Sequence, residues 1–508
     1  MTKGNWGLRA AGLCCVLLPQ AALTITSAEI EASRTTAPEQ GARDYGAYSL
    51  YLNSNSRFID IAGGSVAEIR AATKRSNQDS VPEHIERTRA QAVRVFDQMI
   101  SDHDNARCSA GPAAPLRVMV FIHGGLNTIR DGLSRIAYRT KAMLKDCYHP
   151  VFINWRSGLL SSYGESVRKW DPASEKKGSY WNALLKVPVD LLTMLAEAPE
   201  NWGTEAVHAV RSIRRQPEDM WLDGSELVGS PYEEMVRLPT NPEKLGASRR
   251  ALIWYATSPI KVLSTPVVAK FGARSWDEMR NRALSLTNTP TRATDGVPTP
   301  GFGNTPAICD GVMNDPSRCQ PRGFTTIFFQ ELYDRLESSG RDFSMSLVGH
   351  SMGSIVVNDL LKALPEVELE NLVHMASADT VERVRTIQTN YLKRHSQTQV
   401  YNLYLHPDNE SRETRVWGIA PSGSLLVWID NMFTNPSVVS ERTAGRWDNA
   451  TQSIFQYPAS VAGRVHHRVF TGKPKDEDTV SDDPAVCSPV SHGGFSSCPF
   501  WSPQFWFE

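Results

Sequence analysis

Three short runs of almost uninterrupted apolar residues limit the folds that this chain can adopt. Leu116–Ile122 and Pro150–Trp155 flank a stretch with helical periodicity, Ile129–Lys145, and Phe343–Val348 leads directly into another helical pattern. Strands that are apolar on both faces are typical of parallel sheets, because helices cover both faces of such a sheet. The alternation of strand, helix and strand therefore predicts an α/β fold with a mostly parallel central sheet and helices on both faces.

Further elements extend this pattern along the chain. Pro82 can open a helix, and apolar residues at helical spacing predict a second helix over Phe324–Leu336. A third helix follows Ser351 and stops at Pro365. The additional strands are predicted over Tyr48–Leu52, Arg57–Ile61, Leu372–Met375, Val400–Leu405 and Arg464–Phe470.

The spacing of the strands indicates a large insertion. At 508 residues the chain is longer than most single domains. His123 and Ser351 are 351 − 123 = 228 positions apart, whereas two or three strand–helix–strand units need only about 60 to 90 residues. We therefore divide the chain after its first 28 residues into a first part of the core (29–156), an inserted cap or lid (157–323) and a second part of the core (324–508).

The insertion contains two apolar segments and one long polar stretch. Trp181–Leu195 has an apolar helical face, and Ala251–Phe271 is apolar but interrupted by Pro259 and Pro266. These segments suit a cap with its own small core, or a lid whose apolar face meets a lipid surface or an apolar substrate. Thr287–Arg322 is rich in proline, threonine and glycine, and we expect a long loop there, pinned by Cys309 and Cys319.

The first 28 residues have the features of a secretory signal peptide. Lys3 and Arg9 are basic, Ala10–Leu18 is apolar, and small residues at Thr26–Ala28 suit cleavage. A retained membrane anchor is the alternative, but Pro19 and Gln20 end the apolar run well before the ~20 residues that a span needs. We therefore expect a secreted or periplasmic protein.

Cysteine usage agrees with export. Two of the eight cysteines lie in the signal segment, and the other six form three local pairs. Sequence alone does not fix their connectivity, but pairing of nearest neighbours is the simplest arrangement and suits an oxidising compartment. The expected pairs are Cys108/Cys147, Cys309/Cys319 and Cys487/Cys498.

Charge and composition exclude some classes of partner. The chain has 54 basic and 55 acidic residues, a net charge of -1, so nothing in its overall charge favours binding to nucleic acid. No cysteine pair has the spacing to histidine that a zinc site shows, and we expect no metal.

The segment Gly349-His350-Ser351-Met352-Gly353 places a serine at the corner between a strand and a helix. Such a corner holds the serine on a strained turn, so that its Oγ stands above the sheet, and a Cβ on either glycine would clash with neighbouring backbone. The helix N-terminus behind it favours developing negative charge. Ser351 is thus a candidate nucleophile; the alternative is a tight turn that merely needs small residues.

A second glycine turn follows the strand Leu116–Ile122. His123-Gly124-Gly125 leaves backbone N–H groups available, as stabilisation of an oxyanion in acyl transfer requires. We assign the donors to the amides of Gly125 and Met352, with Gly124 or Leu126 as substitutes for Gly125. An ordinary strand-to-helix turn is the alternative.

With these motifs the chain resembles the α/β-hydrolase fold of the esterase and lipase superfamily, most closely bacterial α/β hydrolases of uncharacterised function. The segments that carry the resemblance are "VFIHGGLNT", "VFINW", "LVGHSMGS" and "YNLYLHPDNES". It covers Leu116–Trp155 and the chain from Phe324 onward, but neither the insertion nor the first hundred residues. The motifs are specific to the fold and not to a substrate.

The resemblance implies a triad in the chain order serine, acid, histidine. Asp408 follows the second strand after the serine and is the expected acid, with Asp379 and Glu410 as rivals. His492 lies beside two glycines, in the segment between Cys487 and Cys498, and is the expected base. His466 and His467 are the alternatives, but both lie inside a strand and not at the carboxyl edge of the sheet.

The implied activity is that of a serine hydrolase that cleaves carboxylic esters without a cofactor. The substrate would be a small-molecule or lipid ester, with a transient contact between the cap and a lipid surface; the oligomeric state stays open. An acyltransferase, a thioesterase or a peptidase could use the same triad, and a binding protein could use the same scaffold without catalysis.

Overall fold

The structure, a computed structural model, describes a core and parts of the insertion. The described residues are 45–53, 56–61, 71–73, 76, 80–105, 114–125, 129–155, 157, 202, 247–287, 307–309, 319–321, 323–413, 423–434, 436–454, 456–472 and 483–507. The signal segment, the apolar stretch at 181–195 and most of the predicted cap lie outside these residues, as do Leu126 and Cys108.

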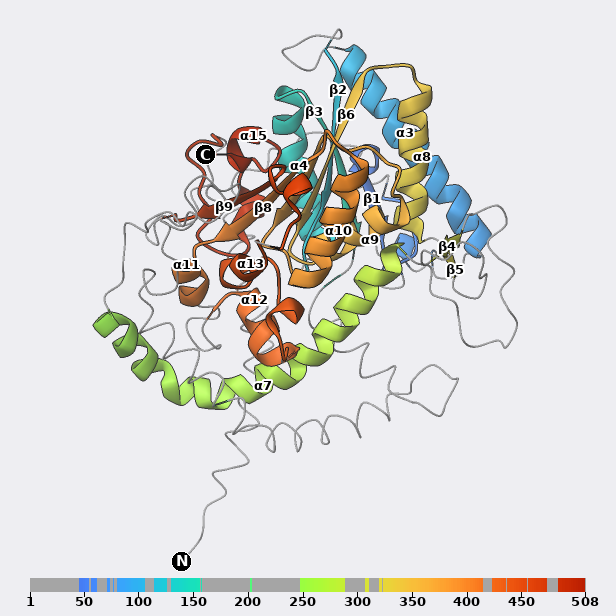
Figure 1. The fold of residues 1–508 in the computed structure, drawn as a ribbon. Helices are drawn as coiled ribbons and strands as arrows, with labels where there is room; N and C mark the ends of the chain where they lie inside the picture. The colour runs from blue at the N-terminus through green and yellow to red at the C-terminus, as the bar shows by residue number, and fades with distance from the viewer. Residues whose placement is uncertain are drawn as a thin grey trace, which may run out of the picture.

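A seven-stranded sheet forms the centre of the molecule (Figure 1). Its strand order is β1-β3-β2-β6-β7-β8-β9, and all neighbouring strands are parallel. The α/β class and the parallel sheet are therefore confirmed. The strands are β1 (Ser49–Leu52), β2 (Leu116–Ile122), β3 (Tyr148–Trp155), β6 (Phe343–His350), β7 (Asn371–Met375), β8 (Gln399–Leu405) and β9 (Val465–Phe470).

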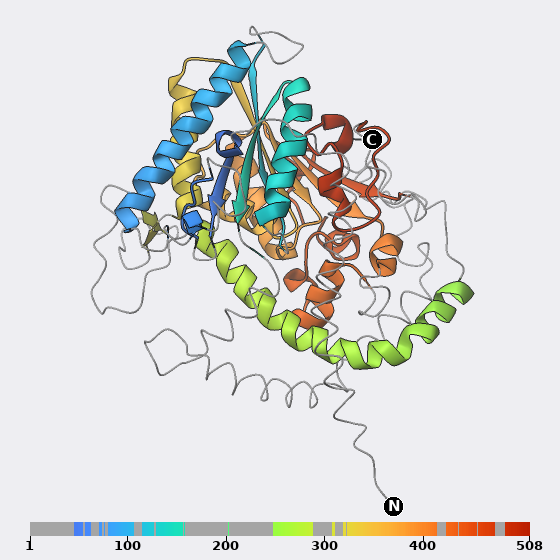
Figure 2. The same ribbon diagram turned by 180° about the vertical axis from the view of Figure 1, so that it is seen from behind.

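Helices cover both faces of this sheet. Figure 1 shows α8 (Phe324–Ser338), α9 (Gly353–Ala363) and α10 (Val381–Arg394) in front of it. Figure 2 shows α4 (Ile129–Lys145) on the other face, beside the C-terminal segment that ends with α15 (Pro503–Trp506). Burial on both faces explains why the central strands are rich in apolar residues.

The remaining elements surround this core. α3 (Val81–Asp104) packs along α8. The shorter elements are η1 (Tyr45–Tyr48), α11 (Pro407–Arg412), α12 (Leu425–Trp428), the π-helical turn η6 (Ile429–Phe433), η7 (Val439–Glu441), α13 (Trp447–Ile454), α14 (Ala459–Ala462) and η8 (Gly494–Ser497).

The order of the strands reverses between β2 and β6. From β2 the chain continues outward to β3, whereas from β6 it continues in the opposite direction through β7 and β8 to β9. In open parallel sheets the crevice beyond the carboxyl ends of two such strands is the usual place for a ligand. His123 follows β2 and Ser351 follows β6, so both candidate motifs lie at this reversal.

Two expected features of the chain are wrong. Arg57–Ile61 is not a strand: Phe58 makes only an isolated antiparallel bridge to Leu52, after a turn in which Ser56 has a φ of 57°. The apolar stretch Ala251–Phe271 is not interrupted at its prolines, because α7 (Ala247–Thr287) runs through both. A proline removes one helical hydrogen bond and bends a helix without ending it where packing supports both sides.

Packing supplies that support for α7. The helix contacts α8, α9 and η6, and Figure 2 shows it crossing the side of the sheet at which the strands end. Beyond it, part of the expected loop Thr287–Arg322 is a small hairpin of β4 (Ala307–Cys309) and β5 (Cys319–Pro321). Cys309 and Cys319 stand opposite each other in its antiparallel register, as their predicted pairing requires.

Candidate functional site

Ser351 occupies a strained backbone position between β6 and α9. Its φ is 54°, in the left-handed region that residues with a side chain rarely adopt. Hydrogen bonds hold this conformation: the Ser351 N–H donates to the Met375 carbonyl at 2.9 Å, and the Ser351 carbonyl accepts from Ala378 at 3.1 Å. The side chain is buried, with 2% exposed. Strain fixed by neighbouring backbone is the geometry expected of a nucleophile at a strand-to-helix corner.

Both glycines of the corner are required by close backbone contacts. A Cβ on Gly353 would lie 2.1 Å from the Ile122 carbonyl oxygen, and a Cβ on Gly349 would lie 2.9 Å from the Ser354 nitrogen. Both distances are well below any contact that a carbon atom tolerates. The glycines thus allow α9 to start directly against the end of β2.

The turn after β2 lies against the serine. A Cβ on Gly124 would lie 2.7 Å from the Ser351 Cβ, and one on Gly125 would lie 2.6 Å from the Met352 sulfur. Gly125 and Met352 are therefore neighbours, although 227 residues (352 − 125) separate them in the chain. The glycine turn and the start of α9 therefore lie next to each other beside Ser351.

His123 holds this turn through both of its ring nitrogens. Nε2 accepts a hydrogen bond from the Trp155 N–H at 3.0 Å, so Nδ1 carries the proton and donates to the Gly124 carbonyl at 2.6 Å. Burial lowers the pKa of His123 to about 3, and the ring is neutral at physiological pH. The sequence reasoning assigned no role to this histidine, whose function here is to link β3 to the glycine turn.

His492 reaches Ser351 from the last part of the chain. Its Nε2 lies 2.8 Å from the Ser351 Oγ, and only 4% of the residue is exposed. This distance suits transfer of the hydroxyl proton to the imidazole. Of the sequence candidates, Ser351 and His492 are thus brought together.

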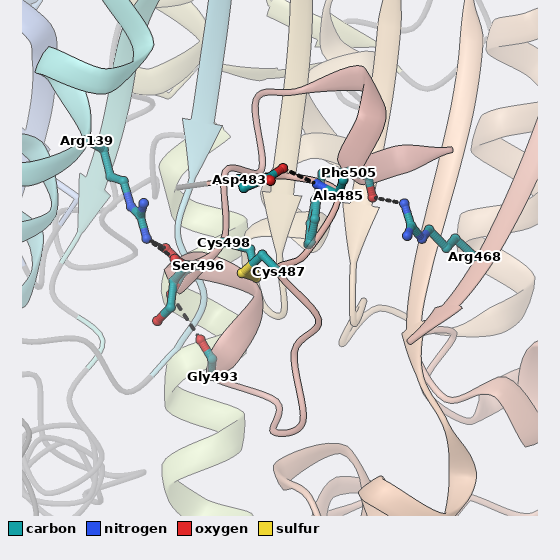
Figure 3. Close-up of a disulfide and its surroundings, with 10 residues drawn as sticks. Arg139, Arg468, Asp483, Ala485, Cys487, Gly493, Ser496, Cys498 and Phe505 are labelled. Atoms are coloured by element: carbon teal, nitrogen blue, oxygen red, sulfur yellow. Dashed lines mark hydrogen bonds between the residues drawn. A yellow bond between two sulfur atoms is a disulfide. The ribbon is translucent and has the colours of Figure 1, made fainter. Parts of the chain in front are cut away.

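The segment around His492 is anchored to the core at several points. Cys487 and Cys498 form a disulfide, as predicted, with their Cα atoms 5.7 Å apart. Figure 3 shows this bridge beside Gly493 and Ser496, with the Arg139 guanidinium of α4 donating to the Ser496 carbonyl at 3.4 Å. The same guanidinium also donates to the Ser497 carbonyl. A short loop without regular strands is thereby held in a fixed place.

Two side chains contact the backbone of His492 itself. The His492 N–H donates to the Glu413 carboxylate at 2.8 Å, and Nε2 of His350 contributes its proton to the His492 carbonyl at 2.9 Å. Sequence reasoning missed both residues. His350 lies inside the serine motif, and nothing in the sequence indicates that it meets the segment of His492. Glu413 precedes a stretch without a regular spacing of apolar residues, so no pattern pointed to it.

The alternative histidines contact side chains of the neighbouring strand β8. His467 in β9 contacts the Tyr404 hydroxyl through Nδ1 at 2.7 Å, and His466 contacts the Gln399 side chain at 3.0 Å. Neither contact involves Ser351, in agreement with their positions inside a strand.

The candidate acids lie in different surroundings. Asp408 is buried at the start of α11, directly after β8, and its backbone N–H donates to Nδ1 of His406 at 3.1 Å. Asp379 accepts hydrogen bonds from Asn358 at 2.7 Å and from the Arg383 Nε at 3.0 Å. Asp379 is therefore committed to an ion pair with Arg383, whereas Asp408 follows β8 in the chain order expected of the acid.

Glu410, the other rival, belongs to a buried polar cluster. Its carboxylate accepts from Ser424 at 3.1 Å and from the Arg446 Nε at 3.4 Å. Burial raises the pKa of Glu410 to about 8, although the Arg446 charge opposes this shift. Glu410 is thus largely protonated near neutral pH, which does not suit the carboxylate of a triad.

α7 reaches the candidate site through Met279. The Met279 sulfur lies 3.7 Å from the point that a Cβ on Gly125 would occupy, and the residue is fully buried. The insertion therefore contributes directly to the wall beside the glycine turn. The sequence prediction treated Pro259 and Pro266 as breaks, so it did not continue this helix to Met279 and did not predict the contact.

The described part of the chain contains neither a group of potential metal ligands nor a helix that could cross a membrane. No three or more His, Cys, Asp or Glu side chains there are grouped so that they could hold a metal ion. Its helices include none with the length and apolar character needed to cross a bilayer.

Comparisons with known proteins leave the family of this chain open. No family model matches it, and neither the curated proteins nor the solved structures yield a significant match. The conclusions about function therefore rest on the chemistry of the Ser351–His492 site.

Proposed function

We propose that this protein is a serine hydrolase that cleaves carboxylic esters through an acyl-enzyme on Ser351. The observation that carries the proposal is the 2.8 Å approach of His492 Nε2 to the Oγ of a serine held at a φ of 54°. A serine needs an adjacent base to become a nucleophile, and strained backbone positions of this kind cluster at active sites.

The mechanism follows from the positions of the groups. His492 takes the proton of Ser351 as its Oγ attacks the ester carbonyl, and the amides of Gly125 and Met352 stabilise the negative oxygen. His492 then returns the proton to the leaving alcohol. Water attacks the acyl-enzyme with His492 as base, which releases the acid and restores Ser351. Asp408 is the proposed third member, orienting the imidazole and stabilising its protonated form.

The scaffold supports an α/β-hydrolase-like arrangement. The serine follows β6, the proposed acid follows β8, two strands later, and the histidine follows β9. This is the order that the resemblance to esterases and lipases implies. We further propose export after removal of residues 1–28, a proposal that the Cys487–Cys498 bridge supports.

The insertion is the part proposed to select the substrate. α7 places the apolar side chain of Met279 beside the glycine turn, where the acyl group of an ester would lie close to the reacting carbonyl. An apolar wall at this point favours small-molecule or lipid esters over charged substrates.

A fluorophosphonate probe tests the proposal, because it reacts covalently with activated serines. The oxidised wild type should be labelled at Ser351, and Ser351→Ala should not. Ser344→Ala, at the other end of β6, is the matched control and should be labelled like the wild type. A folded wild type that reacts no faster than Ser351→Ala would refute the proposal. Hydrolysis of esters of increasing chain length then measures the preference of the apolar wall.

A further inference from the structure

His492 depends on other parts of the molecule for its position. It lies in an irregular segment, one residue before Gly493 and two before the short turn η8. No strand or helix of its own holds the backbone there, yet the ring must stay within hydrogen-bond distance of Ser351. A displacement of about 1 Å can cost a catalytic group roughly 100-fold in rate.

One support comes from the strand that carries the nucleophile. His350 is the last residue of β6 and directly precedes Ser351. Its Nε2 lies 2.9 Å from the His492 carbonyl, and the two rings are 5.3 Å apart. Only a donor can satisfy a carbonyl, so this nitrogen carries the proton of His350. Burial lowers the pKa of His350 to about 3, which keeps this tautomer neutral across the physiological range.

The second support comes from the segment that follows β8. Glu413 follows α11 directly, and its carboxylate accepts from the His492 N–H at 2.8 Å. Its own backbone is fixed in turn, because the Glu413 carbonyl accepts from the Gly423 N–H at 3.0 Å. A hydrogen bond between a carboxylate and a backbone N–H is charge-assisted and stronger than a neutral one.

We propose that His350 and Glu413 are positioning residues that clamp the backbone of His492 from its carbonyl and amide sides and so set the Ser351–His492 distance. This inference rests on the proposed function. The clamp acts on the main chain of His492, and it differs from the acid of a triad, which acts on the imidazole. It ties the base to the nucleophile's own strand and to the segment after the proposed acid, Asp408.

Conservative variants separate clamping from other roles. Glu413→Gln keeps an oxygen that accepts the His492 N–H but removes the charge, whereas Glu413→Ala removes the acceptor. Likewise, His350→Gln keeps a nitrogen donor at the distance of Nε2, whereas His350→Phe keeps a ring without a donor. We expect Ala at 413 and Phe at 350 each to slow fluorophosphonate labelling about tenfold, and Gln at either position to restore most of the rate.

Glu83→Ala is the matched control for the loss at position 413. Glu83 also accepts a backbone N–H with its carboxylate, from Ser80 at 2.7 Å, but at the start of α3. This variant removes the same kind of bond and should be labelled at the wild-type rate. A pH profile of the labelling rate completes the comparison. Clamping predicts that Glu413→Gln leaves its midpoint on the acid side close to the wild-type value, since the amide oxygen still accepts the His492 N–H.

The outcome that overturns the inference is equally specific. If Glu413→Gln is as slow as Glu413→Ala and its acid midpoint moves down, the carboxylate acts on the imidazole and Glu413 is the acid of the triad. If Glu413→Ala and His350→Phe are both labelled like the wild type, there is no clamp.

A readout that needs no activity separates this inference from the proposed function. Hydrogen exchange of the peptide that spans residues 488–497 should be faster in Glu413→Ala and His350→Phe than in the wild type, and should return to the wild-type rate with Gln. If the wild type is not labelled but exchange follows this pattern, the proposed function fails and the clamp stands. Unchanged exchange in both disruptive variants would exclude the clamp.

Discussion

Ser351 and His492 meet at 2.8 Å, yet the two residues are held in different ways. The corner at Ser351 depends on backbone packed against backbone, with glycines at 349 and 353 because no Cβ fits. The segment at His492 is instead joined to the core by a disulfide and by side chains from distant elements. The corner is therefore specified by local sterics, and the histidine segment by contacts that could be removed one at a time.

The same substitution at a glycine of each region tests this difference most strongly. Gly353→Ala places a Cβ 2.1 Å from the Ile122 carbonyl oxygen, which cannot move without disturbing β2. We expect a loss of unfolding free energy on the order of 3–5 kcal/mol.

Gly493→Ala is the counterpart in the histidine segment. Gly493 has a φ of -74°, and a Cβ there would meet nothing within 4 Å. Alanine should therefore leave the unfolding free energy unchanged or raise it by up to about 1 kcal/mol. Urea denaturation of both variants measures the contrast, and equal losses at the two positions would show that the distinction between the regions is wrong.

Asp408 is the proposed acid, and its removal should affect reaction more than folding. Asp408→Asn should slow fluorophosphonate labelling by roughly 10²–10⁴-fold, because the imidazole loses its orienting partner. Asp379→Asn is the control: it breaks the contact with Arg383 and should lower the melting temperature while the folded protein is still labelled. Labelling of Asp408→Asn at the wild-type rate would exclude Asp408 as the acid.

Acid should lower the stability of the folded protein. Burial lowers the pKa of His123 and His350 to about 3, and in the unfolded chain these rings take up protons below about pH 6.5. The unfolded state therefore binds more protons between pH 6.5 and 3, and stability falls as the pH falls through this window. His149, His374 and His467 have the same shift.

Two buried carboxyl groups oppose this trend. Burial raises the pKa of Glu410 to about 8 and that of Asp359 to about 6, so their contributions grow as the pH falls. The five histidines together outweigh them, and we expect a net loss of several kcal/mol of unfolding free energy from pH 7 to pH 5. Urea midpoints at these pH values measure the loss, and His123→Asn should flatten the slope. A midpoint that stays constant or rises on acidification would contradict the expectation.

Loss of the disulfide should cost less stability than Gly353→Ala or acidification. Cys487 and Cys498 close a short loop, with a sequence separation of 11, and Arg139, His350 and Glu413 hold the same segment independently. The double variant Cys487→Ser/Cys498→Ser should lose about 2 kcal/mol, near the lower end for a native bridge. Complete unfolding of this variant in buffer would show that the side-chain contacts do not suffice.

The sequence predicted the parts of the molecule in which periodicity and sterics act locally. The bounds of β2 and α4 agree with their predicted ranges, because a buried strand and an amphipathic helix each carry their own pattern. The corner glycines followed from the strand-to-helix turn for the same reason.

Other features depend on contacts between distant segments. α7 continues through two prolines because α8, α9 and η6 pack against it, and no local pattern reports those partners. Glu413 and His350 meet His492 only in the folded chain, so neither was found as part of the site. The pairing of Ser351 with His492 was predicted only with the help of the resemblance to esterases, since 141 residues separate them.

The separation of Ser351 and His492 also has a consequence for synthesis. The ribosome must add 141 residues after the serine before the histidine exists. At about 5–20 residues per second this takes roughly 7–28 seconds. During that interval the serine has no base, and a chain that terminates early would carry a serine corner without its proton acceptor. The order of the two residues thus delays reactivity until almost all of this sequence has been made.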